Sequence, residues 1–357
     1  MSLVDVLYYL KTAFALVITL SVLVIAHELG HFIVAKLVGV RVEEFALGFG
    51  PKLIRLFKRG DTEYTIHPIP AGGFVKLSGM EPDDEEDPRG YNAQPIWKRF
   101  LIIFAGPFMS FFLGYVIFCS LGITIGLPDP ARNVVGTVRS GSPADRVGLK
   151  SGDRLVAIGD TDISNGQQLQ SIVFRSAGRE LRVRVRRGDK TFVVKATPKE
   201  TLLEGQKVGL LGVTLESSGK VRKYGVVGSI ARGTDITREY LIATYHGLTR
   251  KSELKKVGGI VAITRVTAAG VKEGPAAIII IMASLSLGFA VINLVPWPIL
   301  DGGHILLLGL EIVRRKRLTT KQMGYFQAFG LVTIVALALF LVYADITKWI
   351  GKVPLGQ

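Results

Sequence analysis

The stretch from Thr12 to Ala35 reads TAFALVITLSVLVIAHELGHFIVA and contains neither lysine nor arginine, whereas Lys11 and Lys36 flank it. As a helix these residues would be about 36 Å long, enough to cross a hydrocarbon core of about 30 Å. The stretch lies near the start of the sequence, but it lacks the basic segment and the small-residue cleavage site of a signal peptide. We therefore expect a retained transmembrane span.

Three ionisable residues lie close together within this span: His27, Glu28 and His31. Ionisable groups inside a membrane are energetically costly and usually mark a functional site. On a helix His27 and His31 are one turn apart on the same face, so both can bind one Zn²⁺, with Glu28 beside it as general base. The single cysteine, Cys119, excludes a cysteine-rich metal site. The pattern predicts a hydrolytic zinc site.

A second polar motif follows a later apolar stretch, where residues 293–304 read NLVPWPILDGGH. Pro296 and Pro298 remove backbone donors and interrupt a helix. Irregular backbone at membrane depth is tolerated where it lines a wet cavity. We expect Gly302 and Gly303 to permit a sharp turn at this point.

A catalytic zinc usually has three protein ligands, so one more is needed besides the two histidines. Asp301 is the favoured candidate, and it would complete a His-His-Asp set. His304, three residues later, is the rival within the same motif. Glu43 and Glu44 lie closer to the histidines along the chain and remain alternatives.

Four apolar stretches in all predict a polytopic helical membrane protein. Besides the first, they run from Leu101 to about Leu127, from Ala276 to about Leu300, and from about Tyr325 to Asp345. Basic residues cluster at 314–317 and over 36–100, which places these segments in the cytoplasm by the positive-inside rule. Both termini and the 128–275 segment then face outward. Both polar motifs lie towards the cytoplasmic side.

Together the motifs HELGH at 27–31 and NLVPWPILDGG at 293–303 resemble the site-2 protease family of intramembrane zinc metalloproteases. The resemblance is to the bacterial branch that carries a PDZ domain between spans two and three. It implies that His27, His31 and Asp301 bind zinc, that Glu28 activates water and that Asn293 holds substrate near the metal.

The same resemblance implies a location and a class of substrate. The protein would lie in the bacterial inner membrane and cleave transmembrane segments of single-span proteins, often after an upstream site-1 protease has shortened them. One departure is visible in the second span. The family commonly has Asn a few residues after Ala-Gly-Pro, whereas Ala105-Gly106-Pro107 is followed by Phe-Met-Ser110. We expect the Ser110 hydroxyl to supply the polar contact to substrate.

Residues of about 40–80 alternate β-rich runs with glycine and proline, which indicates hairpins. The family resemblance implies a re-entrant β-structure on the cytoplasmic side, lying against the catalytic spans. An edge strand containing Gly73 and Phe74 could bind an extended substrate by strand addition.

A small β-rich region at 128–200 carries Ser142-Pro-Ala, Gly148-Leu and Gly152-Asp and resembles an extracytoplasmic PDZ domain of α+β type. A size filter for bulky ectodomains is favoured over peptide binding, because no carboxylate-binding loop is apparent around residues 134–138. Residues 201–275 are expected to form an amphipathic linker near the membrane. The net charge of +15 is attributed to solvated faces and the membrane surface, not to nucleic acid, since aromatic residues do not interleave with the basic ones.

Two other functions are compatible with a membrane metal site. A metal transporter would use the same histidines and aspartate, but it would need further ligands along the spans. A catalytically silent scaffold could present the PDZ-like domain, but it would have no use for the base Glu28. The sequence therefore predicts a zinc-dependent endopeptidase.

Overall fold

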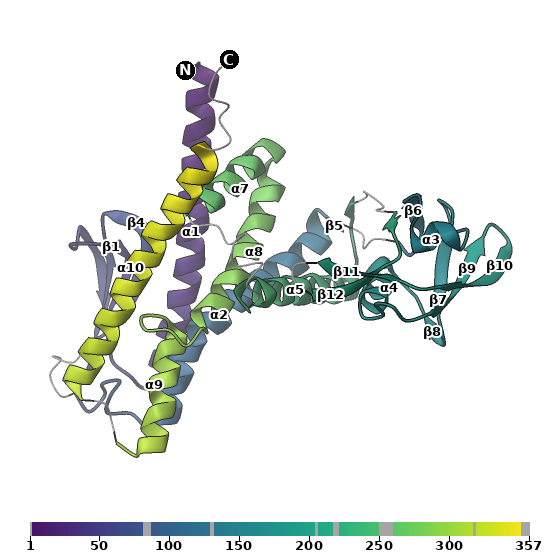
Figure 1. Cartoon of the computed structure of the whole chain (residues 1–357). Helices are drawn as coiled ribbons and strands as arrows, with labels where there is room; N and C mark the ends of the chain where they lie inside the picture. Colours follow the sequence, from purple (N-terminus) through teal and green to yellow (C-terminus); the bar gives the residue numbers. More distant parts are fainter. Residues whose placement is uncertain are drawn as a thin grey trace. The chain divides into compact units, whose positions relative to one another are not determined.

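A computed structural model describes residues 2–80, 87–128, 132–203, 206–216, 221–249, 260–316 and 319–350. The chain divides into two compact units (Figure 1). The first comprises Met1–Ser120, Ile230–Thr249 and Lys256–Gln357, and the second consists chiefly of Leu121–Ser229. All the predicted metal ligands belong to the first unit.

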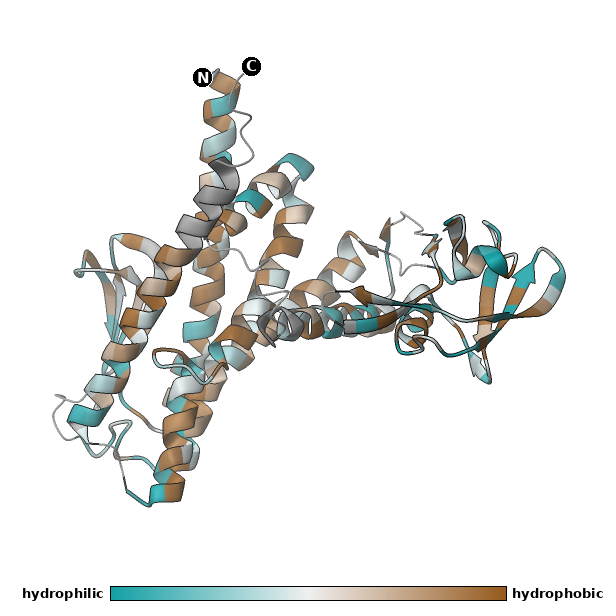
Figure 2. Cartoon of the chain, in the orientation of Figure 1, coloured by the Kyte–Doolittle hydropathy of each residue, from teal (hydrophilic) through white to brown (hydrophobic). Residues whose placement is uncertain are grey.

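In the described part of the chain, four helices are long and apolar enough to cross a membrane, as the sequence predicted. They are α1 (Leu3–Leu37), α2 (Ile96–Thr124), α8 (Pro275–Asn293) and α10 (Thr320–Ile350). Figure 2 shows hydrophobic residues along all four. Helix α1 begins nine residues before the predicted span, because Ser2 and Asp5 form a capping box at its start.

Helix α2 has two faces of different character. Phenylalanines four residues apart form one exposed stripe, with successive ring centroids 5.7–6.4 Å apart: Phe100, Phe104, Phe108 and Phe112. On the opposite side Ile102 and Ser110 are fully buried. A period of 3.6 residues produces this separation, and it directs the small and polar positions of α2 towards α1.

A four-stranded sheet follows α1 and includes the predicted hairpin region. Its strands are β1 (Val42–Phe49), β2 (Ile54–Arg59), β3 (Thr62–Ile66) and β4 (Ile69–Leu77), in the order β2-β3-β1-β4. Hairpins alone do not account for it, because β1 and β3 pair in parallel. Strand β4 lies at one edge and packs against α1. This packing brings the edge that contains Gly73 and Phe74 beside the histidine helix.

The turn after α8 differs from the prediction. Helix α8 ends at Asn293, and a new helix, α9 (Asp301–Arg314), begins at Asp301. The sharp turn lies at Ile299, which has a φ of 79°. Gly302 and Gly303 lie instead in the first turn of α9, where a Cβ would overlap backbone atoms of Val295 and Trp297.

Helix α9 occupies much of the segment between the third and fourth apolar stretches. Its segment Ile305–Leu310 is apolar, and Leu307 and Leu308 are buried. The basic cluster at 314–317 begins at the last residue of this helix, Arg314.

The second unit contains a β-rich domain. A four-stranded sheet has the order β10-β9-β7-β8, formed by β7 (Arg154–Ile158), β8 (Thr161–Asp162), β9 (Leu181–Arg187) and β10 (Lys190–Ala196). Helices α3 (Pro143–Arg146) and α4 (Gly166–Phe174) contribute Ala144, Leu169 and Val173 to one buried cluster with Val183 and Val185.

This domain extends beyond the predicted limit of 200. Strand β13 (Val213–Leu215) pairs with β6 (Val135–Val138), and β11 (Lys199–Leu203) pairs with β12 (Gln206–Leu210). A last short pair joins β5 (Leu127–Pro128) to β14 (Val221–Arg222). The segment expected as a linker therefore completes the β-rich domain before it continues into two helices, α5 (Val226–Thr249) and α7 (Ile260–Glu273).

Candidate metal centre

His27 and His31 lie on one face of α1, where that helix meets α2. Glycine on both helices permits the approach. A Cβ at Gly30 would overlap the carbonyl oxygen of Ala105, and a Cβ at Gly106 would overlap the His31 ring and come within 2.9 Å of His27 Cε1. Both histidines are at least 92% buried. The Ala-Gly-Pro motif of the second span therefore provides the space that the two imidazoles occupy.

Each imidazole is held through its Nδ1 atom by α2. Ser110 Oγ lies 3.1 Å from His27 Nδ1, and the carbonyl oxygen of Ile102 lies 2.8 Å from His31 Nδ1. A carbonyl oxygen only accepts, so His31 Nδ1 carries a hydrogen, and in the neutral ring its Nε2 presents a lone pair. Hydrogen bonds to the ring nitrogen that does not bind the metal fix the orientation and tautomer of metal-binding histidines.

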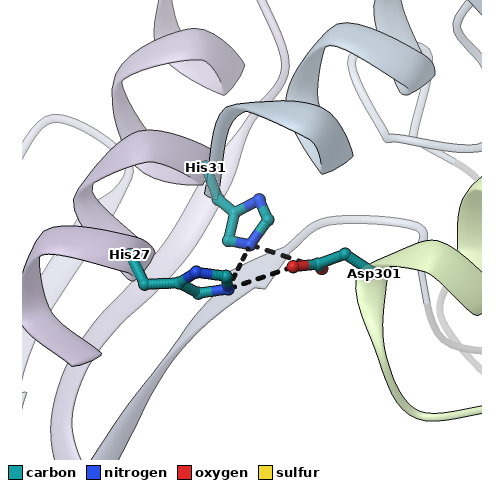
Figure 3. Close-up of side chains that lie close together, drawn as sticks. All are labelled: His27, His31 and Asp301. Carbon is teal, nitrogen blue, oxygen red and sulfur yellow. Dashed lines mark hydrogen bonds and ion pairs between the residues drawn. The ribbon is translucent and has the colours of Figure 1, made fainter. Parts of the chain in front are cut away.

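Asp301, at the start of α9, completes the cluster (Figure 3). Its Oδ2 lies 3.0 Å from His27 Nε2, its Oδ1 lies 3.5 Å from His31 Nε2, and the two Nε2 atoms are 3.2 Å apart. No other group of three or more His, Cys, Asp or Glu side chains in the described part of the chain is close enough to hold a metal ion.

The donor atoms fit a zinc ion by both chemistry and spacing. Bonds of about 2.0–2.1 Å in a tetrahedron separate neighbouring ligand atoms by about 3.3 Å. The two Nε2 atoms are 3.2 Å apart, close to this value, and the carboxylate places one oxygen 3.0 Å from His27 Nε2 and the other 3.5 Å from His31 Nε2. Asp301 Oδ2 is buried and lies 3.0 Å from His27 Nε2, but the geometry there does not make a hydrogen bond, which would be costly unless a cation satisfied the oxygen. Two imidazole nitrogens and one carboxylate are a common ligand set of catalytic zinc sites.

A cavity of about 520 Å³ adjoins the cluster. It is lined by the three clustered residues and by four others predicted to act in the site: Glu28, Gly73, Phe74 and Asn293. Val75 of strand β4 lines the same cavity as Glu28. Asn293 is 94% buried and its Nδ2 has no partner. The structure thus brings together seven of the eight predicted site residues around one space.

Ser110 is the exception, and its predicted contact with substrate is corrected. It is fully buried, does not line the cavity, and lies behind His27. Its own backbone carbonyl accepts a hydrogen bond of 2.6 Å from Ser286 on α8. A short side chain in the close contact between α1 and α2 reaches only the imidazole. Ser110 therefore orients a histidine and does not face a substrate.

The alternative third ligands have other surroundings. Glu43 pairs with Lys76 at 3.2 Å. Glu44 accepts a 2.6 Å hydrogen bond from Thr65 within the sheet. Burial acts to raise the pKa of Glu44, but bonds from Thr65 and His67 and the charge of Lys52 lower it overall. His304 lines the cavity, but it does not belong to the three-residue cluster.

Two contributors were missed by sequence reasoning. The carbonyl of Ile102 leaves no trace in the sequence. Pro107 removes a backbone donor from this part of α2, but the carbonyl that it leaves without a helical partner is that of Ile103. The ring of Phe289 on α8 stands edge-on to His27, with centroids 5.0 Å apart. A single aromatic residue in an apolar span gives no signal that could have identified it.

Comparison with known proteins identifies the class to which this arrangement belongs. The sequence model of Peptidase family M50, the site-2 protease family, matches residues 15–337, which include the cluster and both motifs. The chain belongs to peptidase family M50. Members of the family are metalloproteases that use zinc, so the chain is a zinc metalloprotease.

Relatives of this M50 protease occur in bacteria. A Clostridium perfringens protein is 34% identical, with 91% of this chain and 96% of that protein covered. A Clostridium acetobutylicum protein is 31% identical, with 92% and 96% covered. Both carry provisional zinc metalloprotease names. Among solved structures, the PDZ domain of the SdrC-like protein from Listeria monocytogenes is 20% identical, with a TM-score of 0.22, and covers 24% of this chain and 90% of that domain.

Family membership also decides between the functions that the sequence left open. A transporter or a silent scaffold would not be expected to match a peptidase family over residues 15–337. The prediction of an enzyme and of zinc is confirmed. The four apolar helices fit a membrane-embedded protein, as expected for the family.

Proposed function

We propose that this zinc metalloprotease hydrolyses peptide bonds within or near the transmembrane segments of single-span proteins. The observation that carries the proposal is the cluster of His27, His31 and Asp301 on a cavity between apolar helices. In this proposal these three residues hold zinc. The metal would lower the pKa of water and polarise the scissile carbonyl group.

Glu28 acts as the proton carrier in this proposal. It follows His27 directly, lines the same cavity and is not one of the clustered donors. Its carboxylate accepts the proton of the attacking water and then donates it to the leaving amine.

Substrate would be held on two sides of the cavity. Among the described strands β4 lies at one edge of its sheet and pairs only with β1, so an extended segment can add to its other edge beside Gly73 and Phe74. The unpartnered Nδ2 of Asn293 can donate a hydrogen bond to a substrate carbonyl. A transmembrane helix must unwind to be cleaved, and strand addition replaces the hydrogen bonds that it loses.

The proposal includes a location and partners. The protein would span the bacterial inner membrane, with both termini and the β-rich domain outside and the metal centre towards the cytoplasm. The basic cluster at 314–317 supports this orientation. Its partners would be the lipid bilayer, single-span substrates and an upstream site-1 protease. Nucleic acid would not be a partner.

The β-rich domain would control access by excluding large ectodomains. One observation favours a second role, peptide binding. An apolar cavity of about 420 Å³ lies between α4 and residues Leu210–Leu215. This is a different place from residues 134–138, around which no binding loop was apparent. Strand β13, which lies beyond the predicted domain limit, pairs with β6 and forms part of the cavity lining.

Purified protein tests the central proposal. Replacing His27, His31 or Asp301 by alanine, one at a time, should lower zinc occupancy, measured by metal analysis after dialysis. Glu28→Gln should retain zinc and lose cleavage of a single-span substrate. The matched control is His67→Gln, which alters a buried histidine of the β-sheet region whose Nδ1 lies 2.7 Å from the carbonyl of Gly50. Loss of zinc in Glu28→Gln, or full zinc in Asp301→Ala, would overturn the assignment.

A further inference from the structure

One face of α2 supports all three proposed zinc ligands. Its residues 99, 102, 106 and 110 are three or four positions apart and lie along one stripe of the helix. Ile102 and Ser110 bond the two imidazoles, and Gly106 gives them room. The fourth position of the stripe is Arg99, which contacts neither histidine. Its partner is on α9, the helix that begins with Asp301.

The contact between Arg99 and α9 is a buried ion pair. Arg99 Nη2 lies 2.6 Å from Glu311 Oε1, and the two side chains are 4% and 14% exposed. The guanidinium also lies over the ring of Tyr91, 5.9 Å from its centroid. Arg99 Nε is buried without a hydrogen-bond partner. Glu311 is therefore the charged group that binds this cation, whose desolvation in an apolar surrounding is costly.

Apolar packing and one ion pair fix the position of α9 in the described structure. Before it, the chain passes through the proline turn with Ile299 at positive φ, and the first turn of α9 has no side-chain cap. Buried Leu307 and Leu308 and partly buried Ile305 provide apolar packing, and the two glycines of the first turn lie close to the backbone of the preceding turn. Apolar packing is less directional than a hydrogen-bonded ion pair, so the ion pair is the contact that best specifies how α9 lies along α2.

We infer that Arg99 is a positioning residue, which holds Asp301 against the histidines through Glu311. Asp301 and Glu311 are ten residues apart on one helix, about 15 Å along its axis. Fixing Glu311 against α2 sets the register of α9, and α2 also sets the positions of both imidazoles. The positions of all three donor atoms then depend on contacts with a single helix, α2. A buried ion pair adds little stability over apolar side chains of the same volume, which suits a role in geometry.

A second cavity adjoins this ion pair and supports the same inference. It has a volume of about 200 Å³ and is lined by Tyr91, Arg99, Glu311 and His304, among others. His304 also lines the larger cavity at the metal centre. A shift of α9 would therefore change both cavities. The inference rests on the proposed zinc ligands, so the experiment must distinguish a wrong ligand set from a wrong role for Arg99.

Zinc affinity by chelator competition provides the test, with the absorption spectrum of the Co²⁺-substituted protein as a second measurement. Arg99→Gln and Glu311→Gln should each weaken zinc binding by about 10–100-fold, the range for residues that orient metal ligands. Both should also shift the Co²⁺ bands. The double variant Arg99→Met with Glu311→Met removes both charges of the pair, and it should bind zinc more weakly than the wild type. The double variant also carries the test if the single variants fail to fold.

The control is Asp153→Asn, which breaks an arginine–carboxylate pair in the other unit and should leave zinc affinity and the Co²⁺ spectrum unchanged. Wild-type zinc affinity and spectrum in the methionine double variant would overturn the inference, since the pair would then serve folding alone. Wild-type zinc affinity in Asp301→Ala would instead overturn the proposed ligand set, whatever the result for Arg99.

Discussion

Gly106→Ala should damage the metal centre although it adds only one methyl group. The new Cβ would overlap His31 Nε2, lie 2.5 Å from His31 Cε1 and lie 2.9 Å from His27 Cε1. Ordinary contact needs about 3.4 Å or more, so the rings must retreat by roughly 0.5–1 Å. Zinc–ligand distances tolerate only about 0.2 Å. Both rings are buried and bonded to α2, so they cannot retreat freely.

The magnitude follows from the cost of overpacking, about 1–3 kcal/mol in a well-packed site. At 1.4 kcal/mol for each factor of ten, zinc binding should weaken by about 5- to 150-fold. Chelator competition on purified protein measures this change directly. Gly309→Ala in α9 is the matched control, because a Cβ there meets nothing within 4 Å. Equal zinc affinity in the wild type and in Gly106→Ala would refute the packing argument.

Three further predictions concern topology, the β-rich domain and pH. A topology reporter near Asp160 should indicate the non-cytoplasmic side and one near Arg315 the cytoplasm; the reverse pattern would exclude the proposed orientation. Deleting residues 132–216 should raise cleavage of substrates with large ectodomains and leave trimmed substrates unchanged, whereas slower cleavage of the trimmed form would favour peptide binding in the 420 Å³ cavity. Asp153→Asn should destabilise its domain by about 2 kcal/mol at pH 7, measured by denaturant unfolding, with a difference that shrinks below about pH 4.

The pH dependence of the last variant follows from the surroundings of Asp153. The side chain is fully buried, and burial by itself would raise the pKa of the carboxyl. Hydrogen bonds from Arg187 at 2.7 Å and from the backbone of Lys150 at 2.8 Å outweigh burial, so the pKa is lowered. A carboxyl with a lowered folded-state pKa contributes stability above its unfolded pKa and loses it as pH falls through the folded value. A difference that persisted undiminished at pH 2 would contradict this reasoning.

The sequence predicted the two histidines of the candidate metal centre because their chemistry is local, whereas Asp301 was chosen from a second motif far along the chain. Two histidines one turn apart share a helix face whatever the rest of the fold does. Four spans were also predictable, since length and apolar content are properties of a segment. Helix α9 was not, because its 14 residues are too few to span a membrane and its basic end resembled a loop. The parallel pairing of β1 with β3 depends on contacts between distant segments, which no local pattern encodes.

Ser110 shows why a residue can be identified correctly and given the wrong role. A polar side chain in an apolar span predicts function, but the sequence does not say which neighbour it faces. In the structure Ser110 lies eleven residues, about three turns, after Arg99, on the same stripe of α2 as Ile102 and Gly106. Each member of this stripe acts on a ligand or on the helix that carries one, and none needs to touch substrate. Opposite this stripe, the exposed phenylalanines leave α2 suited to lipid. A single helix thus separates the surface that faces the membrane from the surface that shapes the metal centre.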